Sequence, residues 1–385
     1  MAIVFIDGVR TPHGTLLGSL GDVSAIDLGV TAVDGLLERT GIETADWVCL
    51  GNAIQAGLGQ VPGRQVVVAS SLPDETETTT VNEASGSGLR AIALAADRIT
   101  AGRAELAIAG GFESMTNAPF VLPDYRKGRK HGDARLVDSM IRDALWDESY
   151  DAHMGELTER LVERETIPRE RQDRYAAGSH ARADRAIKQG QFAAEIVPVE
   201  TRERVVERDE GPRPESTVES LAELQPAFRE DGTITAGNAS KLADGAGVVL
   251  LADEDAALAR GREPKAELVD YELAYQDPQW FNVSVADATE RLLDRNDLSA
   301  EDIAHFELNE AFAAQMVYVM DRLDIPREKL NPNGGAVAFG HPIGASGGML
   351  ATSLVYALSP GEYGVVGMSI GGGGGIAALV RGYDS

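Results

Sequence analysis

Residues 83–111 read EASGSGLRAIALAADRITAGRAELAIAGG: a turn of small residues, then a helical pattern, then a short apolar run. The apolar residues of the middle part recur at helical spacing. These residues are Leu89, Ile92, Ala96 and Ile99. After Glu105, the run at 106–111 has no polar side chain, which is typical of a strand buried on both faces. A turn, a helix and a buried strand in this order indicate an α/β fold, with a mostly parallel sheet covered by helices.

The segments that precede this stretch continue the alternation. AIVFID at 2–7 is expected to form a strand, and AIDLGVTAVDGLLERTG at 25–41 an amphipathic helix that ends at its glycine. WVCLGNAI at 47–54 predicts another buried strand. Residues 1–118 are therefore expected to form one α/β unit.

Residues 119–239 have a different character. They are polar and charged, and they contain connections rich in Pro and Gly such as EGPRPES at 210–216. Helical patterns recur at 135–145 and 168–187, whereas strand signals are sparse. We interpret this part as an inserted, mainly helical excursion, after which 240–254 returns to a strand.

The last third of the chain repeats the first. The helix, acidic turn and strand expected at 284–312 parallel those at 26–53, and the turn and helix at 341–358 parallel those at 83–99. Such a duplication suggests two similar α/β halves with the active site between them. The domains are therefore expected at 1–118 together with 240–262, at 119–239, and at 263–385.

The charge of the chain is strongly negative. It has 61 acidic and 35 basic residues, a net charge of −26, and only six lysines. Such a surface repels nucleic acids and anionic membranes, so neither is expected as a partner. An acidic surface also suits high salt, which screens the self-repulsion, and it predicts a halophilic, haloarchaeal source.

The chain shows no signal for a membrane or for secretion. No run of about 18 apolar residues is present, and the first residues, MAIVFIDGVRTP, resemble a strand and not a signal peptide. The single cysteine, Cys49, excludes an internal disulfide framework and a Cys-rich metal site. It lies in an apolar strand and is interpreted as a core residue. A cytoplasmic enzyme without a bound metal is the simplest expectation.

Four short segments rich in Gly, Ser, His and Asn lie where a strand or turn meets another element. They are EASGSG at 83–88, NEAF at 309–312, GHPIGASG at 340–347 and SIGGGGG at 369–375. A single such turn is weak evidence of a site, because structural turns are common. Four of them, spread over both halves of the chain, form a stronger pattern.

Three residues in these segments are candidates for catalysis, and each has a simpler alternative. Ser85 precedes a helix, whose N-terminus favours negative charge on a nucleophile, but most serines there only cap the helix. His341, between Gly340 and Pro342, is placed to accept a proton, although it fits an ordinary loop histidine too. Asn309 ends a buried strand and suits an oxyanion or a water, or else an Asx-type turn.

Taken together, the segments resemble the thiolase superfamily, specifically its acetyl-CoA acetyltransferase and 3-ketoacyl-CoA thiolase branch. The similarity runs nearly end to end and includes VNEASGSGL, AGGFESM, AHMGELTERL, NEAFAAQ and NPNGGAVAFGHPIGASG in family order. It implies a thiolase fold, with two α/β core domains in alternating layers of helices and sheets. A mainly helical loop domain, for CoA binding and tetramerisation, would complete it.

The resemblance also implies a chemistry, the reversible Claisen condensation of two acyl-CoA molecules through an acyl-enzyme. Ser85 takes the nucleophile position, His341 its activator, and Asn309 the residue that holds an oxyanion-hole water. The N–H groups of Ser85 and Gly371 match a second oxyanion hole. CoA and acyl-CoA would be substrates, with no tightly bound cofactor. The positions that line the CoA site are His153, Met154, Arg213, Ser220, Ala236 and Ser240.

The loop at 126–155 resembles the biosynthetic, tetrameric branch, which implies short acyl groups and a homotetramer built from dimers. The chain departs from the family at both catalytic cysteines, because serines stand at 85 and at 369. A serine needs a base at the moment of attack, and it is itself a poor general base.

Several readings of this departure stay open. In an active thiolase, His341 would activate Ser85, and His153, a water or Ser369 would replace the second cysteine. Alternatively, the chain is a non-catalytic acyl-CoA-binding or scaffolding subunit that needs a small OB-fold or zinc-ribbon partner. An engineered trapping variant of a Cys enzyme is a third reading. Slow thioester hydrolysis is a further outcome.

Overall fold

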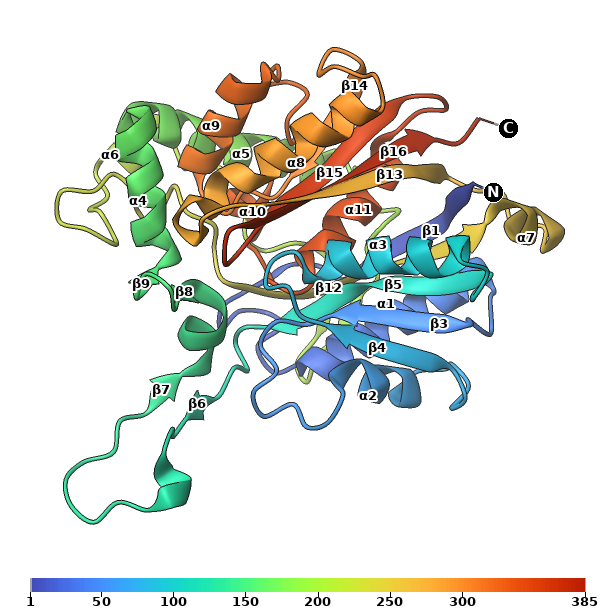
Figure 1. The fold of residues 1–385 in the computed structure, drawn as a ribbon, viewed down its shortest axis with the longest axis horizontal. Helices are drawn as coiled ribbons and strands as arrows, with labels where there is room; N and C mark the ends of the chain where they lie inside the picture. Colours follow the sequence, from blue (N-terminus) through green and yellow to red (C-terminus); the bar gives the residue numbers. More distant parts are fainter. Residues whose placement is uncertain (1, 385) are drawn as a thin grey trace.

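A ten-stranded mixed sheet forms the centre of the molecule (Figure 1). The computed structural model describes residues 2–384. The strands lie in the order β14-β15-β16-β13-β1-β12-β5-β3-β4, with the short β2 paired to β12. Their bounds are β1 Ile3–Arg10, β2 Gly14–Thr15, β3 Trp47–Gly51, β4 Glu77–Val81, β5 Leu106–Ser114, β12 Ala243–Asp253, β13 Ala266–Tyr275, β14 Ile303–Leu308, β15 Tyr363–Ile370 and β16 Gly374–Gly382.

The order of the strands is symmetric about the pairing of β1 with β13. On one side follow β12, β5 and β3, and on the other β16, β15 and β14; β4 adds one more strand at the edge of the first side. The two halves join through a short antiparallel ladder of three residue pairs, from Ile3 with Leu268 to Phe5 with Ala266. The internal duplication predicted from the sequence is thus confirmed in the topology of the sheet.

The expectation of a mostly parallel sheet is wrong, because two strands in the middle of the halves run against their neighbours. β3 is parallel to β4 and β5, and β14 is parallel to β15. β12 enters only after the long insertion and lies antiparallel to β1 and β5. β16 follows β15 through the three glycines at 371–373, and so short a connection permits only an antiparallel pair.

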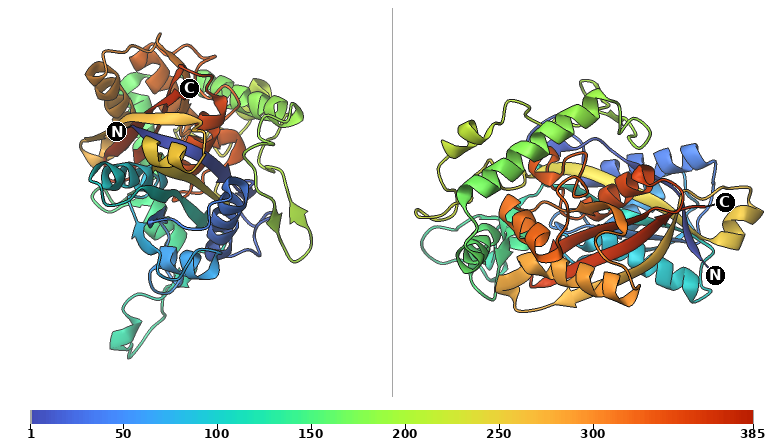
Figure 2. Two further views of the ribbon diagram at one scale, coloured as in Figure 1. Left: turned by 90° about the vertical axis from the view of Figure 1, so that its right-hand side faces the viewer. Right: turned by 90° about the horizontal axis from the view of Figure 1, so that it is seen from above.

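Helices make three layers around the two halves of the sheet (Figures 1 and 2). α1 and α2 pack on the outer face of the first half, and α8 and α9 cover that of the second. α3 and α11 lie between the halves and pack on each other, in a core that draws residues from both. The bounds are α1 Ala25–Thr40, α2 Pro62–Ala69, α3 Ser87–Thr100, α7 Glu254–Ala259, α8 Phe281–Arg295, α9 Ala313–Leu323, α10 Ala336–Phe339 and α11 Ser346–Ala357.

The excursion between β5 and β12 contains α4 (Met154–Glu165), α5 (Arg169–Lys188) and α6 (Val218–Ala222). α4 and α5 pack against α9 and so lie on the second half. α5 confirms the helix predicted at 168–187. The remaining elements are short: β6 Phe120–Val121, η1 Tyr125–Lys127, β7 Val137–Asp138, η2 Ile141–Leu145, β8 Trp146–Asp147, β9 Ala152–His153, β10 Val199–Glu200, β11 Val205–Val206 and η3 Pro278–Trp280.

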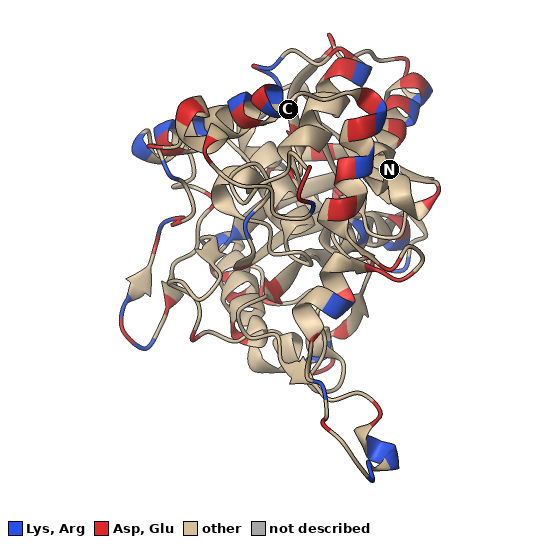
Figure 3. Ribbon diagram, turned by 90° about the vertical axis from the view of Figure 1, so that its left-hand side faces the viewer, with Lys and Arg blue, Asp and Glu red and all other residues tan. Residues whose placement is uncertain are grey.

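The helix predicted at 135–145 is wrong over its first part, where the chain forms β7, and 141–145 form a single π-helical turn. β6 and β7 pair into a hairpin that protrudes from the body (Figure 1). Leu136 and Ile141 are exposed, so the segment has no continuous buried face for a longer helix, although Met140, Ala144 and Leu145 pack against a small core. Basic residues gather at the tip of the hairpin, whereas acidic ones are spread over the body (Figure 3). No helix among residues 2–384 is long and apolar enough to cross a membrane.

Candidate active site

The N-termini of α3 and α11 meet at the centre of the molecule, and glycines permit the contact. A Cβ atom on Gly88 would lie 2.9 Å from the backbone nitrogen of Gly348, and one on Gly347 would lie 2.1 Å from that of Leu89. Both distances are too short for any side chain. The contact brings the loop before α3, with Ser85, against the loop before α11, with His341.

The side chain of Ser85 does not cap the helix that follows it. The N-cap of α3 is Gly86, and no side chain caps that helix. The hydroxyl of Ser87 holds the turn by accepting from the N–H of Glu83 and donating to the carbonyl of Ala84. Ala84 itself has a φ of 46°, a strained value that turns the next residue outward. The N-cap alternative for Ser85 is therefore wrong.

The side chain of Ser85 instead contacts His341, with 2.9 Å between Oγ and Nε2. On the other side of the ring, Nδ1 lies 2.6 Å from Oγ of Ser346, which donates its own hydrogen to the carbonyl of Pro342. Ser346 must then accept from Nδ1–H, so Nε2 carries the lone pair. Nδ2 of Asn309 lies 3.3 Å from the same Nε2. The sequence-predicted Ser85, His341 and Asn309 thus form one cluster.

Electrostatics keep His341 neutral. Burial, and then the charge of the nearby His13, lower the pKa of His341 to about 3. At neutral pH the ring is therefore an acceptor, ready to take the proton of the Ser85 hydroxyl.

The loop that carries His341 is fastened at two points. The N–H of His341 donates to the carbonyl of Lys241, and the N–H of Gly344 donates to the carboxyl of Glu113. Glu113 also accepts from the N–H groups of Ala53 and Ile54, so it joins the loops after β3 and before α11. Sequence reasoning missed this role, although Glu113 lies in the quoted segment AGGFESM.

Ser369 lies at the end of β15 and is held as a hydrogen-bond acceptor. Nε2 of Gln315 donates to its Oγ at 2.7 Å, and the hydroxyl points to the carbonyl of Asn282 at 3.4 Å. Ser369 is buried, and no titratable group contacts it through these bonds. This arrangement does not make Ser369 a base.

A cavity of about 590 Å³ opens in front of Ser85, a size that suits a small-molecule substrate. Gly371 borders it, and a Cβ on Gly371 would lie 3.7 Å from that of Ala84, so the two loops adjoin. Asn309 lies behind His341, on the wall of a second, smaller cavity. The sequence-predicted residues that line the large cavity are Ser85, His341, Ser369, Gly371, His153, Met154, Arg213, Ala236 and Ser240.

Two of the residues predicted to line the CoA site have other local roles. Ser220 is exposed, is not among the residues that line the cavity, and exchanges cap hydrogen bonds with Thr217 in α6. His153 lines the cavity, but its Nδ1 accepts from the N–H of Gly155 and caps α4. Burial lowers the pKa of His153, so the neutral ring carries its hydrogen on Nε2 and is not a free base there.

Lys241 is a cavity residue that sequence reasoning missed. It borders the cavity next to Ser240, and its Nζ donates to the carbonyls of Gly211 and Ala338. Burial, and then the charge of Arg213, lower the pKa of Lys241 to about 7. Two cationic side chains therefore face this cavity in a protein that is otherwise strongly acidic. The only signal in the sequence was a lysine, a rare residue here, at the start of the strand predicted within 240–254.

Comparisons with known proteins agree with this geometry. The family described as Thiolase, N-terminal domain matches residues 3–255, and Thiolase, C-terminal domain matches 262–382. A "Probable acetyl-CoA acyltransferase" of Staphylococcus epidermidis is 44% identical over 390 residues, which cover 99% of each chain. An "Acetyl-CoA acetyltransferase" of Pseudomonas aeruginosa is 43% identical over 384 residues, 97% of this chain and 98% of its own.

Solved structures show the same likeness. The Bacillus anthracis acetyl-CoA acetyltransferase superposes with a TM-score of 0.95 at 37% identity, covering 99% of this chain and 98% of its own. The Acat5 thiolase of Ascaris suum, solved in complex with coenzyme A, has a TM-score of 0.93 at 36% identity and covers 99% and 100%. The chain belongs to the thiolase family and has the thiolase fold.

Proposed function

We propose that this chain is an acyl-CoA C-acyltransferase of the thiolase type, which acts through an acyl-enzyme on Ser85. The observation that carries the proposal is the 2.9 Å contact between Oγ of Ser85 and the unprotonated Nε2 of His341, at the wall of a cavity of substrate size. Relatives over 40% identical along the full chain bear acyltransferase names, which does not favour the scaffold alternative.

The first half-reaction follows from the cluster. Oγ of Ser85 attacks the thioester carbonyl while its proton moves to Nε2 of His341, and the CoA thiolate leaves with that proton. The product is an oxygen ester on Ser85 and free CoA. We assign oxyanion stabilisation to the N–H groups of Ser85 and Gly371, and to a water held by Asn309.

The second half-reaction needs a base for the α-proton of the incoming acyl-CoA, where the family has its second cysteine. Oγ of Ser369 is an alcohol oxygen that already accepts from Gln315, and Nδ1 of His153 already accepts from the N–H of Gly155. Neither side chain therefore has a basic lone pair free to take the α-proton. These contacts favour a water beside Ser369 as the proton carrier. Slow hydrolysis of the acyl-serine by the same water is a competing outcome.

For CoA, a substrate and not a bound cofactor, we assign Arg213 and Lys241 to its phosphates, and His153, Met154, Ala236 and Ser240 to the neighbouring walls. Ser220 would contact CoA only outside the cavity. The protruding hairpin supports a tetramer through residues 119–239, with the core domains at 1–118 plus 240–262 and at 263–385. Short acyl groups, a haloarchaeal source, a cytoplasmic location and a small OB-fold or zinc-ribbon partner stay predictions.

The test is to mix the purified chain with acetyl-CoA in high salt and to measure intact mass and released CoA. We expect one acetyl group on Ser85, absent in Ser85→Ala. If neither the acetyl adduct nor thiolysis of acetoacetyl-CoA is detected, the proposal is wrong. Binding of CoA without turnover, together with a co-purifying partner, would favour the scaffold alternative. A cysteine at both positions of the native gene would show that the serines are engineered.

A further inference from the structure

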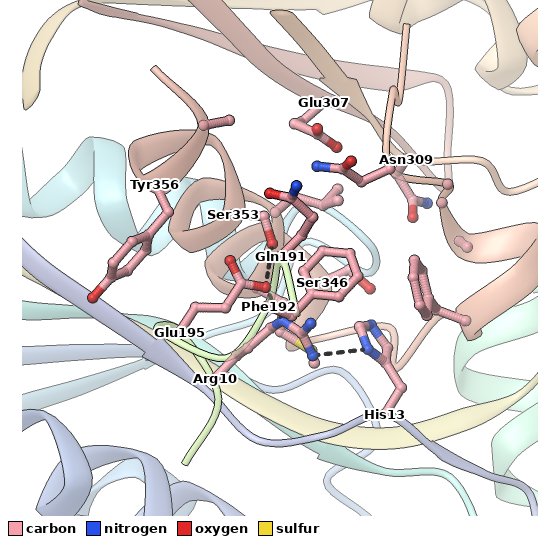
Figure 4. A pocket seen from close by; sticks show the side chains of 18 of the residues that line it. Arg10, His13, Gln191, Phe192, Glu195, Glu307, Asn309, Ser346, Ser353 and Tyr356 are labelled. Carbon is pink, nitrogen blue, oxygen red and sulfur yellow. Dashed lines mark hydrogen bonds and ion pairs between the residues drawn. The ribbon is translucent and has the colours of Figure 1, made fainter. Parts of the chain in front are cut away.

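A second cavity, of about 70 Å³, lies between Arg10, Glu307 and Tyr356 (Figure 4). Its wall includes Ser346 and Asn309, the two residues that contact the imidazole besides Ser85. Most of its other lining side chains are polar, so it is suited to hold several ordered waters, each of which needs about 15 Å³ by this measure. His341 therefore borders the substrate cavity and is linked to the inner cavity through Asn309 and Ser346.

Glu307 is the one acidic side chain of this inner cavity that has no partner among residues 2–384. Glu307 is 4% exposed, and no hydrogen bond or ion pair acts on the pKa of its carboxyl. Glu195, by contrast, is paired with Arg10 at 2.6 Å. Glu307 lies near the end of β14 and Asn309 directly follows this strand; both line the inner cavity, and Figure 4 shows the carboxyl turned toward the amide.

The surroundings of Glu307 favour its neutral form. Burial, followed by the charges of Glu195 and Glu310, raises the pKa of Glu307 well above its ordinary value. The cations nearby are already engaged: Arg10 binds Glu195 and Asp209, and His13 contacts Asp209 at 2.9 Å. Tyr356, the remaining titratable side chain on this wall, donates to Asp7. Glu307 is thus a carboxylic acid with a hydrogen to donate.

Asn309 needs such a donor. Nδ2 of Asn309 faces the lone pair of His341, which leaves Oδ1 on the side of the inner cavity. If the amide turned over, its oxygen would face the lone pair of Nε2, and two acceptors would repel each other. A donor on Oδ1 selects the productive orientation.

We propose that Glu307, as a neutral carboxylic acid, is a positioning residue that donates through cavity water to Oδ1 of Asn309 and so holds Nδ2 toward His341. The proposal rests on the proposed function of Ser85 and His341, because the amide that Glu307 orients serves that pair. The carboxylate form of Glu307 has no hydrogen to donate, so acylation of Ser85 declines once Glu307 ionises.

The first test follows single-turnover acylation of Ser85 by acetyl-CoA across the pH range. The wild type is expected to lose rate on the alkaline side. Glu307→Gln keeps an N–H donor and cannot ionise, so it loses this alkaline decline. Glu307→Leu lacks a donor at any pH, so it should acylate about tenfold more slowly than the wild type below the midpoint of the decline, the effect of one hydrogen bond, and show no alkaline decline of its own. The matched control is Glu267→Gln, with its melting temperature, because Glu267 is half-buried, pairs with Arg381 and does not line the inner cavity.

The proposal is overturned if Glu307→Gln keeps the alkaline decline with the wild-type pH midpoint. It is also overturned if folded Glu307→Leu acylates Ser85 at the wild-type rate. A second measurement is independent of turnover. In protein with ¹⁵N-asparagine, the side-chain resonance of Asn309, assigned by its loss in Asn309→Asp, should shift with pH in the wild type and not in Glu307→Gln. If no acyl adduct forms but this shift is seen, only the proposed function fails; if the shift is absent, the role of Glu307 fails.

Discussion

Oγ of Ser346 lies 2.6 Å from Nδ1 of His341, on the opposite side of the imidazole from Ser85. Because Ser346 donates its hydrogen to Pro342, it fixes the tautomer in which Nε2 accepts. Ser346→Ala should therefore lower the rate of Ser85 acylation by about tenfold, with little change in KM for acyl-CoA. Stopped-flow release of CoA measures this rate.

The matched control is Ser353→Ala, on the same helix, whose hydroxyl binds Glu195 and does not contact His341. A KM that rises as much as kcat falls would contradict the role of Ser346 in fixing the tautomer, because it would show a loss of binding.

Replacing the oxygen nucleophile with sulfur should speed the condensation. Ser85→Cys supplies a thiol that ionises near neutrality and leaves a thioester, which passes its acyl group on more readily than an ester does. We expect acetoacetyl-CoA formation to rise by about tenfold or more. Cys49→Ser in the same background controls for the native thiol. An unchanged or lower rate would show that the surroundings of Ser85 are specific for a hydroxyl.

Binding of CoA should weaken with rising pH through Lys241. Its pKa is lowered to about 7 by burial and then by Arg213, so its positive charge is present below that pH and is lost above it. Titration calorimetry at constant salt should show the Kd for CoA rising between about pH 6 and 8. Lys241→Arg, which stays charged, should give a nearly flat profile, and the exposed Lys188→Arg the wild-type one. A wild-type slope in Lys241→Arg would contradict the prediction.

Asp209 should contribute strongly to stability through its buried ion pair with Arg10. Burial alone would raise the pKa of Asp209, but Arg10 and His13 hold it well below its ordinary value. Its contribution is therefore present at neutral pH and is lost in acid, as the pH falls below about 4. Asp209→Asn should lower the free energy of unfolding by about 3–5 kcal/mol, because it leaves Arg10 buried and incompletely paired.

Denaturant titrations at low and high salt check this prediction. The control is Asp321→Asn, which breaks the exposed pair with Arg171 and should cost about 0–1 kcal/mol. The loss at Asp209 should persist in high salt, because buried charges are poorly screened. A loss at Asp209 no larger than that at Asp321 would argue that the network relaxes around the change.

The sequence was sufficient for the elements with strong periodicity. The helix and strand in 83–111 and the duplication were predictable, because apolar spacing alone defines them. The contact between Ser85 and His341 was available only through the family resemblance, since 256 positions separate the two residues. The direction of β12 and the hairpin at 120–138 depend on long-range packing, which no local pattern encodes.

The roles of Ser346, Lys241 and Glu307 were out of reach for a related reason. All three lie in or beside segments that the sequence marked, yet their function depends on which neighbour each side chain meets. Glu307 looks like an acidic residue in a strand until its burial beside Glu195 becomes visible. The short glycine contact between α3 and α11, which assembles the cluster, was equally hidden.

Cys49 is fully buried in β3, and burial raises its pKa to about 12. Cys49 is the single cysteine of the chain, and the proposed nucleophile, Ser85, carries a hydroxyl, so the protein has no accessible thiol. Oxidants and alkylating reagents that disable cysteine-dependent acyltransferases through their thiol should find no reactive thiol here. Under oxidative stress, this acyl transfer would therefore not depend on cellular reductants that keep an active-site thiol reduced.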